Sequence, residues 1–394
     1  METPPKKSLN FDDTEIAFRN KSNAELNAAY WLFKIISSNF LTKIGPPITN
    51  FSLNIGLPIK GIIKATIFKH FCGGETIAEC EHTIAQLHSG NVGTILDYSV
   101  EGEEEEAVFD FTCEEIIRTI ERAAGDPRIP ITVFKVTGIG RFGLLEKLDA
   151  KKELSAAEQA EFDKVRKRCE KICRAAFEKN VPIMVDAEET WIQDTIDELA
   201  MDMMRLFNRE RIIVYNTYQM YRHDKLVDMK ADHLIAKAEG FILGVKMVRG
   251  AYMEKERKRA EEMGYLSPIQ PDKAASDRDY NASLHYCMEH IAEIAFVCGT
   301  HNEESCRILA QLLDEHNINH NHPHVYFAQL LGMSDNLSFN LSDAGYNVTK
   351  YVPYGPVKAV MPYLFRRAQE NTSIAGATSR ELGLIIKEKK RRRL

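Results

Sequence analysis

The chain has 394 residues, of which 44% are hydrophobic and 27% charged, the composition of a globular protein with one large domain or two ordinary ones. Its formal net charge of −6 argues against nucleic acid as a partner. No apolar segment approaches transmembrane length, and the N-terminal METPPKKSLNFDDTEIAF lacks the apolar region of a signal peptide and is too acidic for a transit peptide. We therefore expect a cytoplasmic protein that is at most peripheral at the inner face of a membrane.

The cysteines do not form a disulfide framework. None belongs to a CxxC pair, and their spacing favours reduced thiols. The eight positions are Cys72, Cys80, Cys113, Cys169, Cys173, Cys287, Cys298 and Cys306.

The first 90 residues predict helices, interrupted at GPP (45–47) and GLP (56–58). From residue 94 onward, short β-rich segments alternate with longer segments typical of helices, including 155–180, 190–208 and 222–239. The glutamate-rich EGEEEE (101–106) predicts a solvated loop. The expected strands are TILDYSV (94–100), ITVFKV (131–136), VPIMVD (181–186), RIIVYNTY (211–218), FILGVKMV (241–248), IAFVCG (294–299), HVYFAQ (324–329) and YNVTKYV (346–352).

Eight alternating strand–helix units over about 250 residues predict an α/β protein with a (βα)8 barrel similar to that of triosephosphate isomerase. We expect three parts: a helical N-terminal extension (1–90), the barrel (91–375) and a short basic C-terminal tail (376–394). In this fold the catalytic groups lie at the carboxyl ends of the strands.

The predicted strand ends are rich in polar residues, so they predict one functional rim of the barrel. We expect Asp186 to form an ion pair with Lys135 near this rim. The polar positions are Lys135, Asp186 to Glu189, Gln219, Lys246 to Tyr252, Thr300 to Asn302, Gln329 and Tyr351.

The segment YLFRRAQEN (363–371) follows the last strand and places Tyr363, Arg366, Arg367 and Glu370 at i, i+3, i+4 and i+7, on one helical face. Adjacent arginines most often belong to a solvated surface. Here the position after the eighth strand favours an anion site, because a guanidinium binds a carboxylate through two parallel hydrogen bonds. We expect Glu370 to hold one arginine in place.

Two other motifs predict loops. GIGRFG (138–143) matches the dinucleotide fingerprint, but it follows the second strand, and Asp163, about twenty residues further on, lies in a predicted helix. His316, His320, His322 and His324 precede the seventh strand without acidic or cysteine neighbours, so we expect a surface loop and no metal site.

The basic tail KEKKRRRL (387–394) leaves two interpretations open. It predicts a solvated helix end in preference to a weak anchor on anionic lipid.

Several motifs together resemble those of one family. PIMVDAEE (182–189), KMVRGAY (246–252), THN (300–302), YVPYG (351–355) and YLFRRAQEN occur in this order at the strand ends of proline dehydrogenases. Over residues 90–375 the chain resembles the monofunctional, eukaryote-like branch of that family. It departs from many bacterial members, in which the residue types at Lys246 and Arg249 are exchanged, and it lacks the aldehyde dehydrogenase half of bifunctional relatives.

The resemblance implies a barrel that binds FAD noncovalently, oxidises L-proline to 1-pyrroline-5-carboxylate and passes electrons to a membrane quinone. It implies catalytic roles for Asp186 and Lys246. The implied substrate-binding residues are Lys135, Tyr351, Tyr363, Arg366 and Arg367. The implied cofactor-binding residues are Ala187, Gln219, Lys246, Val248, Arg249, Gly250, Ala251, Thr300, His301, Gln329 and Glu370.

Three alternatives remain open. A hydroxyproline dehydrogenase of the same family is disfavoured by Tyr351, because that branch carries serine at the matching position. A Schiff-base aldolase could use Lys135 or Lys246 as its nucleophile. An inert barrel with a membrane-docking module is disfavoured, because the polar groups gather at one rim.

Overall fold

The structure is a computed structural model that describes residues 9–36, 60–100, 104–373 and 377–394, with side-chain surroundings for all of these except 368–373 and 377–379. The predicted GPP and GLP interruptions lie outside these residues. No helix in the described part of the chain is long and apolar enough to cross a membrane.

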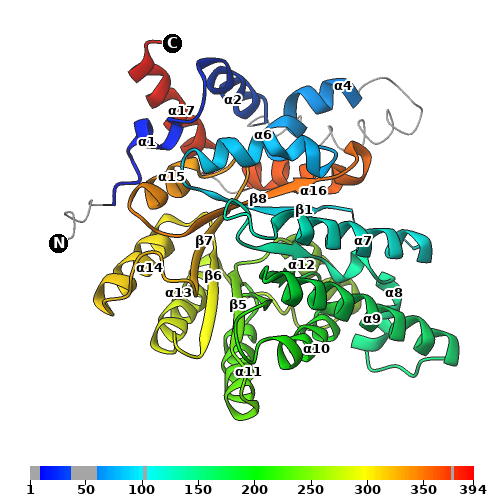
Figure 1. Ribbon diagram of the computed structural model, residues 1–394. Coiled ribbons are helices and arrows are strands. Elements are labelled where there is room, and N and C mark those ends of the chain that lie inside the picture. The colour runs from blue at the N-terminus through cyan, green and yellow to red at the C-terminus, as the bar shows by residue number, and fades with distance from the viewer. Residues whose placement is uncertain (1–8, 37–59, 101–103, 374–376) are drawn as a thin grey trace. The chain divides into compact units, whose positions relative to one another are not determined.

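All eight predicted strands are present, and they form a closed parallel barrel in chain order from β1 to β8. The (βα)8 fold is therefore confirmed. Figure 1 shows β5, β6 and β7 side by side, as their printed pairings require. The strands are β1 (Gly93–Tyr98), β2 (Thr132–Phe134), β3 (Ile183–Val185), β4 (Val214–Gln219), β5 (Leu243–Val248), β6 (Ile294–Gly299), β7 (Val325–Leu330) and β8 (Val348–Tyr354).

Helices alternate with these strands, and the predicted segments 155–180, 190–208 and 222–239 correspond to three of them. The helices before β2 are α1 (Thr14–Phe18), α2 (Asn23–Ile36), α4 (Lys60–Ile63), η1 (Lys64–Phe68), α5 (Lys69–Phe71), α6 (Ile77–His88) and α7 (Glu106–Ala123). The later ones are η2 (Val136–Gly138), α8 (Phe142–Asp149), α9 (Ala156–Lys179), α10 (Thr190–Phe207), α11 (Lys225–Glu239), α12 (Met253–Met263), α13 (Lys273–Glu289), α14 (Glu303–Glu315), α15 (Asp335–Asp343), α16 (Val357–Ser373) and α17 (Ala377–Arg392).

Local sequence explains where the longest helix begins and ends. Ser155 and Glu158 form a capping box at the start of α9, in which each side chain accepts from the backbone N–H of the other residue. Asn180 ends the helix with a φ of 54°, in the left-handed region that asparagine tolerates better than most residues.

The chain divides into two compact units that do not follow chain order. Unit 1 consists of Met1–Ser99 and Gln329–Leu394, and unit 2 of Val100–Ala328. In unit 1, an apolar cluster joins the N-terminal helices to α16 and α17; it includes Phe33, Phe68, Leu364 and Ile385. The residues preceding the barrel thus pack against the helix that carries the arginine pair.

The eighth strand lies two residues further along the chain than predicted. Parallel pairing with β1 runs from Gly93↔Thr349 to Tyr98↔Tyr354, so Tyr351 is the middle residue of β8 and not its end, as the sequence had suggested. The strand continues because the backbone N–H of Ser99 still donates to the carbonyl of Tyr354, at 3.0 Å.

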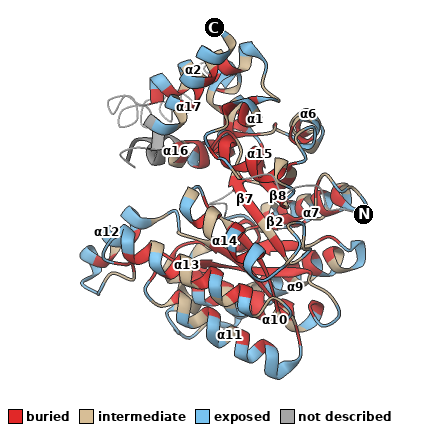
Figure 2. Ribbon diagram, turned by 90° about the vertical axis from the view of Figure 1, so that its left-hand side faces the viewer, coloured by how far each residue is buried: buried red, intermediate tan, exposed pale blue. Residues whose placement is uncertain are grey.

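In unit 2, the strands are almost wholly buried and the helices expose one face to solvent. Figure 2 shows both buried and exposed residues on α10 and mostly exposed residues on α12. Close packing explains Gly244 of β5, because a Cβ atom there would lie 2.2 Å from the carbonyl oxygen of Val214.

Two predictions about charged segments need correction. Glu106 is not part of a loop: it begins α7 and forms an ion pair with the nearly buried Arg168. The C-terminal tail is helical, as predicted, but it is not simply solvated. Within α17, Glu388 is fully buried and Arg392 donates to the backbone carbonyls of Phe18 and Lys21.

Candidate active site

A carboxylate and two lysines meet at the carboxyl ends of three strands of unit 2. Asp186 follows β3, Lys135 follows β2, and Lys246 lies in β5. The Lys135 Nζ lies 3.5 Å from Asp186 Oδ2, which confirms the predicted pair, and Lys246 Nζ forms a closer ion pair with Asp186 Oδ1. The side chains of Lys135, Asp186 and Lys246 are only 11%, 13% and 7% exposed.

This cluster carries an excess of positive charge. Two ammonium groups share one carboxylate, which leaves one formal positive charge in a site largely withdrawn from water. Such a site stabilises a negative charge nearby and opposes a further positive one. Removing one of the three side chains takes an opposite charge away from a buried group, so the stability of each member depends on the others.

Arg249, one residue past β5, is held by a different set of partners. Its guanidinium donates to Asp277 Oδ1 at 2.7 Å, Thr300 Oγ1 at 2.8 Å and Ser305 Oγ at 3.0 Å. Its central carbon also lies 4.3 Å from the ring centroid of Tyr280. The structure thus places Lys246 with the carboxylate of β3 and Arg249 with the segment after β6.

Sequence reasoning missed two of these partners on α13. Asp277 and Tyr280 are one helical turn apart, so both face Arg249. Burial alone would raise the pKa of Asp277, but hydrogen bonds from Lys273 and Arg249 bring it below its usual value. The i, i+3 spacing was the available signal, but no local pattern connects α13 with Arg249.

Gln219 is the last residue of β4, and only one of its two polar side-chain atoms forms a hydrogen bond among the described residues. Its Nε2 donates to the carbonyl of Glu188 at 3.0 Å. Its Oε1 is buried and has no hydrogen-bond partner among the residues that the structure describes. Ala187, between Asp186 and Glu188, is half-buried. An acceptor without a donor at a strand end is suited to the N–H of a ligand.

The other predicted cofactor residues of unit 2 lie near the ends of β5 and β6. Val248 ends β5 and pairs with Gln219, while Gly250 and Ala251 are exposed. Gly250 has a φ of 130°, and a Cβ atom there would lie 2.4 Å from the ring of Tyr221, which explains the glycine. After β6, His301 is exposed.

In unit 1, α16 brings Tyr363 and Arg367 together. The Arg367 guanidinium lies 5.1 Å from the centroid of the Tyr363 ring, and the two residues are 6% and 7% exposed. Arg366 is half-buried. The alternative of a solvated arginine face does not hold for Arg367, since both members of this pair are buried. Glu370 lies on α16, but its side chain is outside the described residues.

Two further predicted residues of unit 1 lie on strands. Tyr351 of β8 is 7% exposed, and its carbonyl accepts from the N–H of Leu331 at 2.9 Å. Gln329 of β7 is 2% exposed, and its Oε1 accepts from the Ser338 hydroxyl at 2.9 Å. That contact makes Gln329 part of the packing between β7 and α15.

Sequence reasoning also missed a buried ionic network in unit 1. Lys350 is fully buried and forms an ion pair with Asp335 at 2.9 Å; Lys21 reaches the same carboxylate at 3.1 Å. Lys350 also donates to the carbonyl of Met333 at 2.6 Å. The strong attraction of the two lysines outweighs burial and lowers the pKa of Asp335. The partners are too far apart in sequence for a local pattern to reveal them.

The structure also shows where the two predicted loop motifs lie. GIGRFG runs from η2 into α8, and Asp163 lies inside α9, as expected for a barrel loop. The histidines precede β7, as predicted. The prediction that they have no acidic neighbour is wrong, because His320 Nε2 lies 2.9 Å from Asp314 Oδ1. No group of three potential metal ligands occurs among the described residues.

Comparison with known sequences identifies the family. The profile of the proline dehydrogenase family matches residues 80–380. Proline dehydrogenase 1, mitochondrial, of Dictyostelium discoideum is 33% identical over 428 aligned positions, covering 96% of this chain and 74% of that protein. The human protein of the same name is 39% identical over 270 positions. That match covers 68% of this chain and 45% of the human protein, so the chain spans less than half of that relative.

Comparison with solved structures supports the fold. The crystal structure of proline utilization A from Bdellovibrio bacteriovorus, a protein inactivated there by N-propargylglycine, superposes on this chain with a TM-score of 0.72 and 21% sequence identity. The match covers 94% of this chain and 40% of that one. On the extent of the family match and the identity to the amoebal relative, the chain belongs to the proline dehydrogenase family.

Proposed function

We propose that the protein oxidises L-proline to 1-pyrroline-5-carboxylate, with FAD as a noncovalent cofactor and a membrane quinone as final electron acceptor. The observation that carries the proposal is the cluster of Lys135, Asp186 and Lys246, because a nearly buried site with excess positive charge suits this chemistry. Family membership names proline as the substrate.

Residues of unit 2 fit FAD, which combines an isoalloxazine ring with an anionic diphosphate. The unpaired Oε1 of Gln219 offers an acceptor for a ring N–H. Lys246 and Arg249 supply positive charge, and Thr300 supplies a hydroxyl beside Arg249. We infer that these residues, with Ala187, Val248, Gly250, Ala251 and His301, hold FAD, which would accept the hydride from the substrate.

The chain's own residues would act on proline by binding and by electrostatics. Arg366 and Arg367 would bind the carboxylate, and the rings of Tyr351 and Tyr363 would lie against the apolar ring of proline. A hydride leaves the carbon beside the ring nitrogen only when that nitrogen has an available lone pair. The excess positive charge of the lysine cluster would lower the pKa of the substrate ammonium and favour loss of its proton.

No separate strong base is needed in this scheme. The proton on the substrate nitrogen can pass to water, while Asp186 keeps the two lysines in place. Tyr351 fills space beside the ring, so we propose proline in preference to hydroxyproline. A quinone dissolved in a membrane would require contact from the aqueous side, and we propose a peripheral location at the inner face.

A visible absorption spectrum of the purified protein tests the proposal. We expect the visible absorption bands of an oxidised flavin, which bleach when proline is added without an acceptor. Acid precipitation should release the yellow colour into the supernatant. A colourless protein that is trapped by borohydride in the presence of an aldehyde or ketone substrate would favour the aldolase alternative instead.

A further inference from the structure

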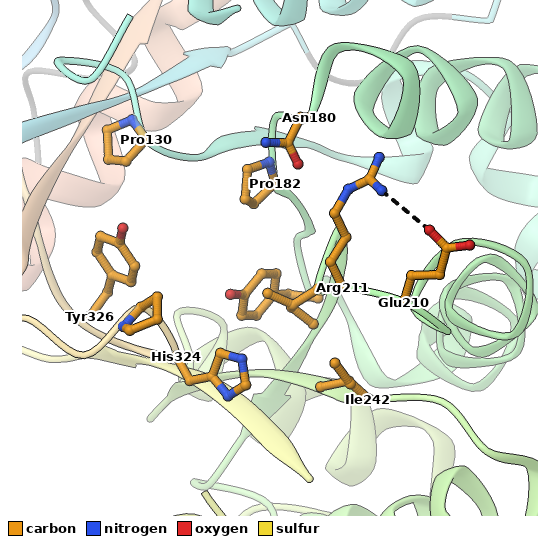
Figure 3. Close-up of a pocket in the computed structure, with 11 residues that line it drawn as sticks. Pro130, Asn180, Pro182, Glu210, Arg211, Ile242, His324 and Tyr326 are labelled. Atoms are coloured by element: carbon orange, nitrogen blue, oxygen red, sulfur yellow. Dashed lines mark ion pairs between the residues drawn. The ribbon is translucent and has the colours of Figure 1, made fainter. Parts of the chain in front are cut away.

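The pairing of β2 with β3 is short and ends before the lysine cluster. Each strand has three residues, and the last paired positions are Phe134↔Val185. The pairing begins after Pro182, which lines a cavity of about 450 Å³ at the start of the strands (Figure 3). Lys135 and Asp186 follow the last pair, so contacts beyond the strands are needed to fix the backbone that carries their side chains.

Glu188 connects the two segments that follow these strands. One carboxylate oxygen accepts from the N–H of Thr137 at 3.1 Å, and the Thr137 hydroxyl donates to the other. Glu188 is only 3% exposed. Thr137 belongs to η2, the turn that begins one residue after Lys135, and Glu188 lies two residues after Asp186. The Thr137–Glu188 contact therefore joins the chain segments that carry both members of the Lys135–Asp186 ion pair.

The main chain of Glu188 is held by two further elements. Its N–H donates to Gln193 Oε1 of α10 at 2.7 Å, and its carbonyl accepts from Gln219 Nε2 of β4 at 3.0 Å. Gln193 is fully buried, and its Nε2 donates to Asp197 Oδ1 at 2.7 Å. Asp197 is paired in turn with Lys225 of α11, at 2.8 Å. Glu188 is thus fixed from the turn after β2, from β4 and from α10.

The chemistry of these contacts favours a role in positioning over one in packing. An apolar side chain would fill the same space without the cost of burying a carboxylate. Hydrogen bonds are directional, so those of Glu188 fix distance and orientation as packing does not. A Coulomb interaction depends on distance and on exposure to water, so the effect of the lysine cluster on a nearby group depends on this alignment.

We propose that Glu188 is a positioning residue, which acts through Thr137 to keep Lys135 and Asp186 in the arrangement that the substrate nitrogen meets. This inference rests on the proposed oxidation of proline, in which the cluster acts on that nitrogen. Loosening the Thr137–Glu188 contact would let the lysines move toward water, where their charge has less effect. The pKa of the substrate ammonium would then be lowered less.

Thr137→Val tests the proposal with little disturbance, because valine has a similar shape and removes only the hydroxyl that bonds to Glu188. Proline oxidation by the full chain with its cofactor is followed over a range of pH, with a redox dye as electron acceptor. We expect the acidic limb of the kcat profile to move to higher pH by about 0.5 unit or more. Thr137→Ser, which keeps the hydroxyl, should restore the original profile.

A second contact of the same kind supplies a matched control. The N–H and hydroxyl of Thr190 donate to the fully buried carboxylate of Glu256 at 2.8 and 2.6 Å, and this contact joins α10 to α12. Thr190→Val should lower Tm as Thr137→Val does but leave the pH profile unchanged. An equal displacement of the profile in both variants would overturn the proposal, because loss of stability alone would then explain it.

Two other variants separate position from charge. Glu188→Gln keeps an acceptor for the N–H of Thr137 and places a donor near its hydroxyl, so we expect the original pH profile. A limb displaced to lower pH would show instead that Glu188 acts through its negative charge, which would overturn the proposal. If Thr137→Val fails to fold, Gln193→Met loosens Glu188 from the side of α10 and should move the limb to higher pH.

A double-mutant cycle tests the positioning without reference to catalysis. Urea denaturation is measured for Thr137→Val, Lys135→Met and the double variant. The double variant should lose less stability than the two single losses added together, because Thr137 then no longer has a Lys135–Asp186 pair to align. Thr190→Val combined with Lys135→Met should be additive. Additivity in both cycles would overturn the proposal, whereas a wild-type protein that does not oxidise proline would refute the proposed function and leave this cycle to decide the positioning.

Discussion

At the scale of single residues, Asp186 determines the arrangement of the candidate site in unit 2. Both Lys135 and Lys246 contact its carboxylate, and all three side chains are largely buried. The stability of such a group depends on its complete set of partners, because an isolated buried charge is much more costly than a paired one.

The variant Asp186→Asn should therefore lower the free energy of unfolding by roughly 3–5 kcal/mol, because it preserves side-chain shape but removes the charge that both buried ammonium groups contact. Urea denaturation measures this loss, with Asp163→Asn on the exposed side of α9 as a control. Adding Lys135→Met to Asp186→Asn should restore part of the stability. A loss below about 1 kcal/mol would mean that water already solvates the lysines.

Arg367 is the second residue whose role is directly testable. Arg367→Met should raise the KM for proline at least about tenfold, since it would remove the proposed charge-assisted pair with the proline carboxylate. The stacking of Arg367 on Tyr363 adds a stability loss of about 0.5–1 kcal/mol, which thermal unfolding would detect. Lys358→Met, an exposed lysine on the same helix, is the control. An unchanged KM would mean that Arg367 serves packing alone.

At the scale of secondary structure, α17 converts a basic tail into a packed helix of unit 1. Lys389 Nζ donates to Asn27 Oδ1 of α2 and lies 4.4 Å from the Tyr30 ring centroid. Arg392 donates to two backbone carbonyls, and the buried Glu388 binds Arg391 and Arg392. These contacts use charges that a lipid anchor would need to present to a membrane.

Substitutions of two adjacent arginines test whether α17 has a structural role or binds a membrane. Arg392→Met should lower the free energy of unfolding by about 1–3 kcal/mol, because the carbonyls of Phe18 and Lys21 lose their donor. Arg393→Met, at an exposed position, should leave stability within about 0.5 kcal/mol. Guanidinium chloride denaturation gives both values. Equal effects would contradict the packing of α17, and vesicle flotation would then test lipid binding.

The short helix α5 contributes a pH-dependent element to unit 1. His70 Nε2 contacts the carbonyl of Gly332 at 2.9 Å. Burial lowers the pKa of His70 to about 4, and the positive charges of Lys21 and Lys350 act in the same direction while Asp335 opposes them. The folded protein therefore holds His70 neutral where the unfolded chain, with an ordinary pKa of about 6.5, takes up a proton.

The contribution of His70 to the free energy of unfolding should therefore be fully present above pH 6.5. As the pH falls from 6.5 to 4, the free energy of unfolding should decrease by at most about 1.4 kcal/mol per pH unit, because the unfolded chain takes up the proton first. His70→Gln should reduce this slope. Asp149, whose pKa burial raises to about 6, acts in the opposite direction in both proteins and cancels in the comparison. Urea denaturation at several pH values measures the slopes, and identical slopes would contradict the assignment.

At the scale of the whole molecule, all eight cysteines are buried and none forms a disulfide. Burial raises the pKa of Cys80 to about 12 and that of Cys113 to about 11, so few thiolates are available. Only the thiolate reacts readily with a disulfide reagent. The folded state should therefore protect the thiols in both units.

Ellman's reagent should label almost none of the eight cysteines in the native protein and all of them in urea. Proline or FAD should not change the total. Cys298 is the sensitive position, because hydrogen bonds from Cys306 and Tyr280 lower its pKa against the effect of burial. Rapid native labelling at several sites would show that a unit opens more often than this burial implies.

The sequence by itself determined the eight strands, the barrel and the strand-end position of Asp186 and Lys135, because hydrophobic periodicity and turn residues act over short stretches of chain. Tertiary structure alone decided that Lys246 shares Asp186, that Arg249 turns to α13, that Lys350 is buried in an ionic network and that α17 packs on α1 and α2. Each of these depends on side chains far apart in sequence, whose partners are set only when the strands pair and the helices pack.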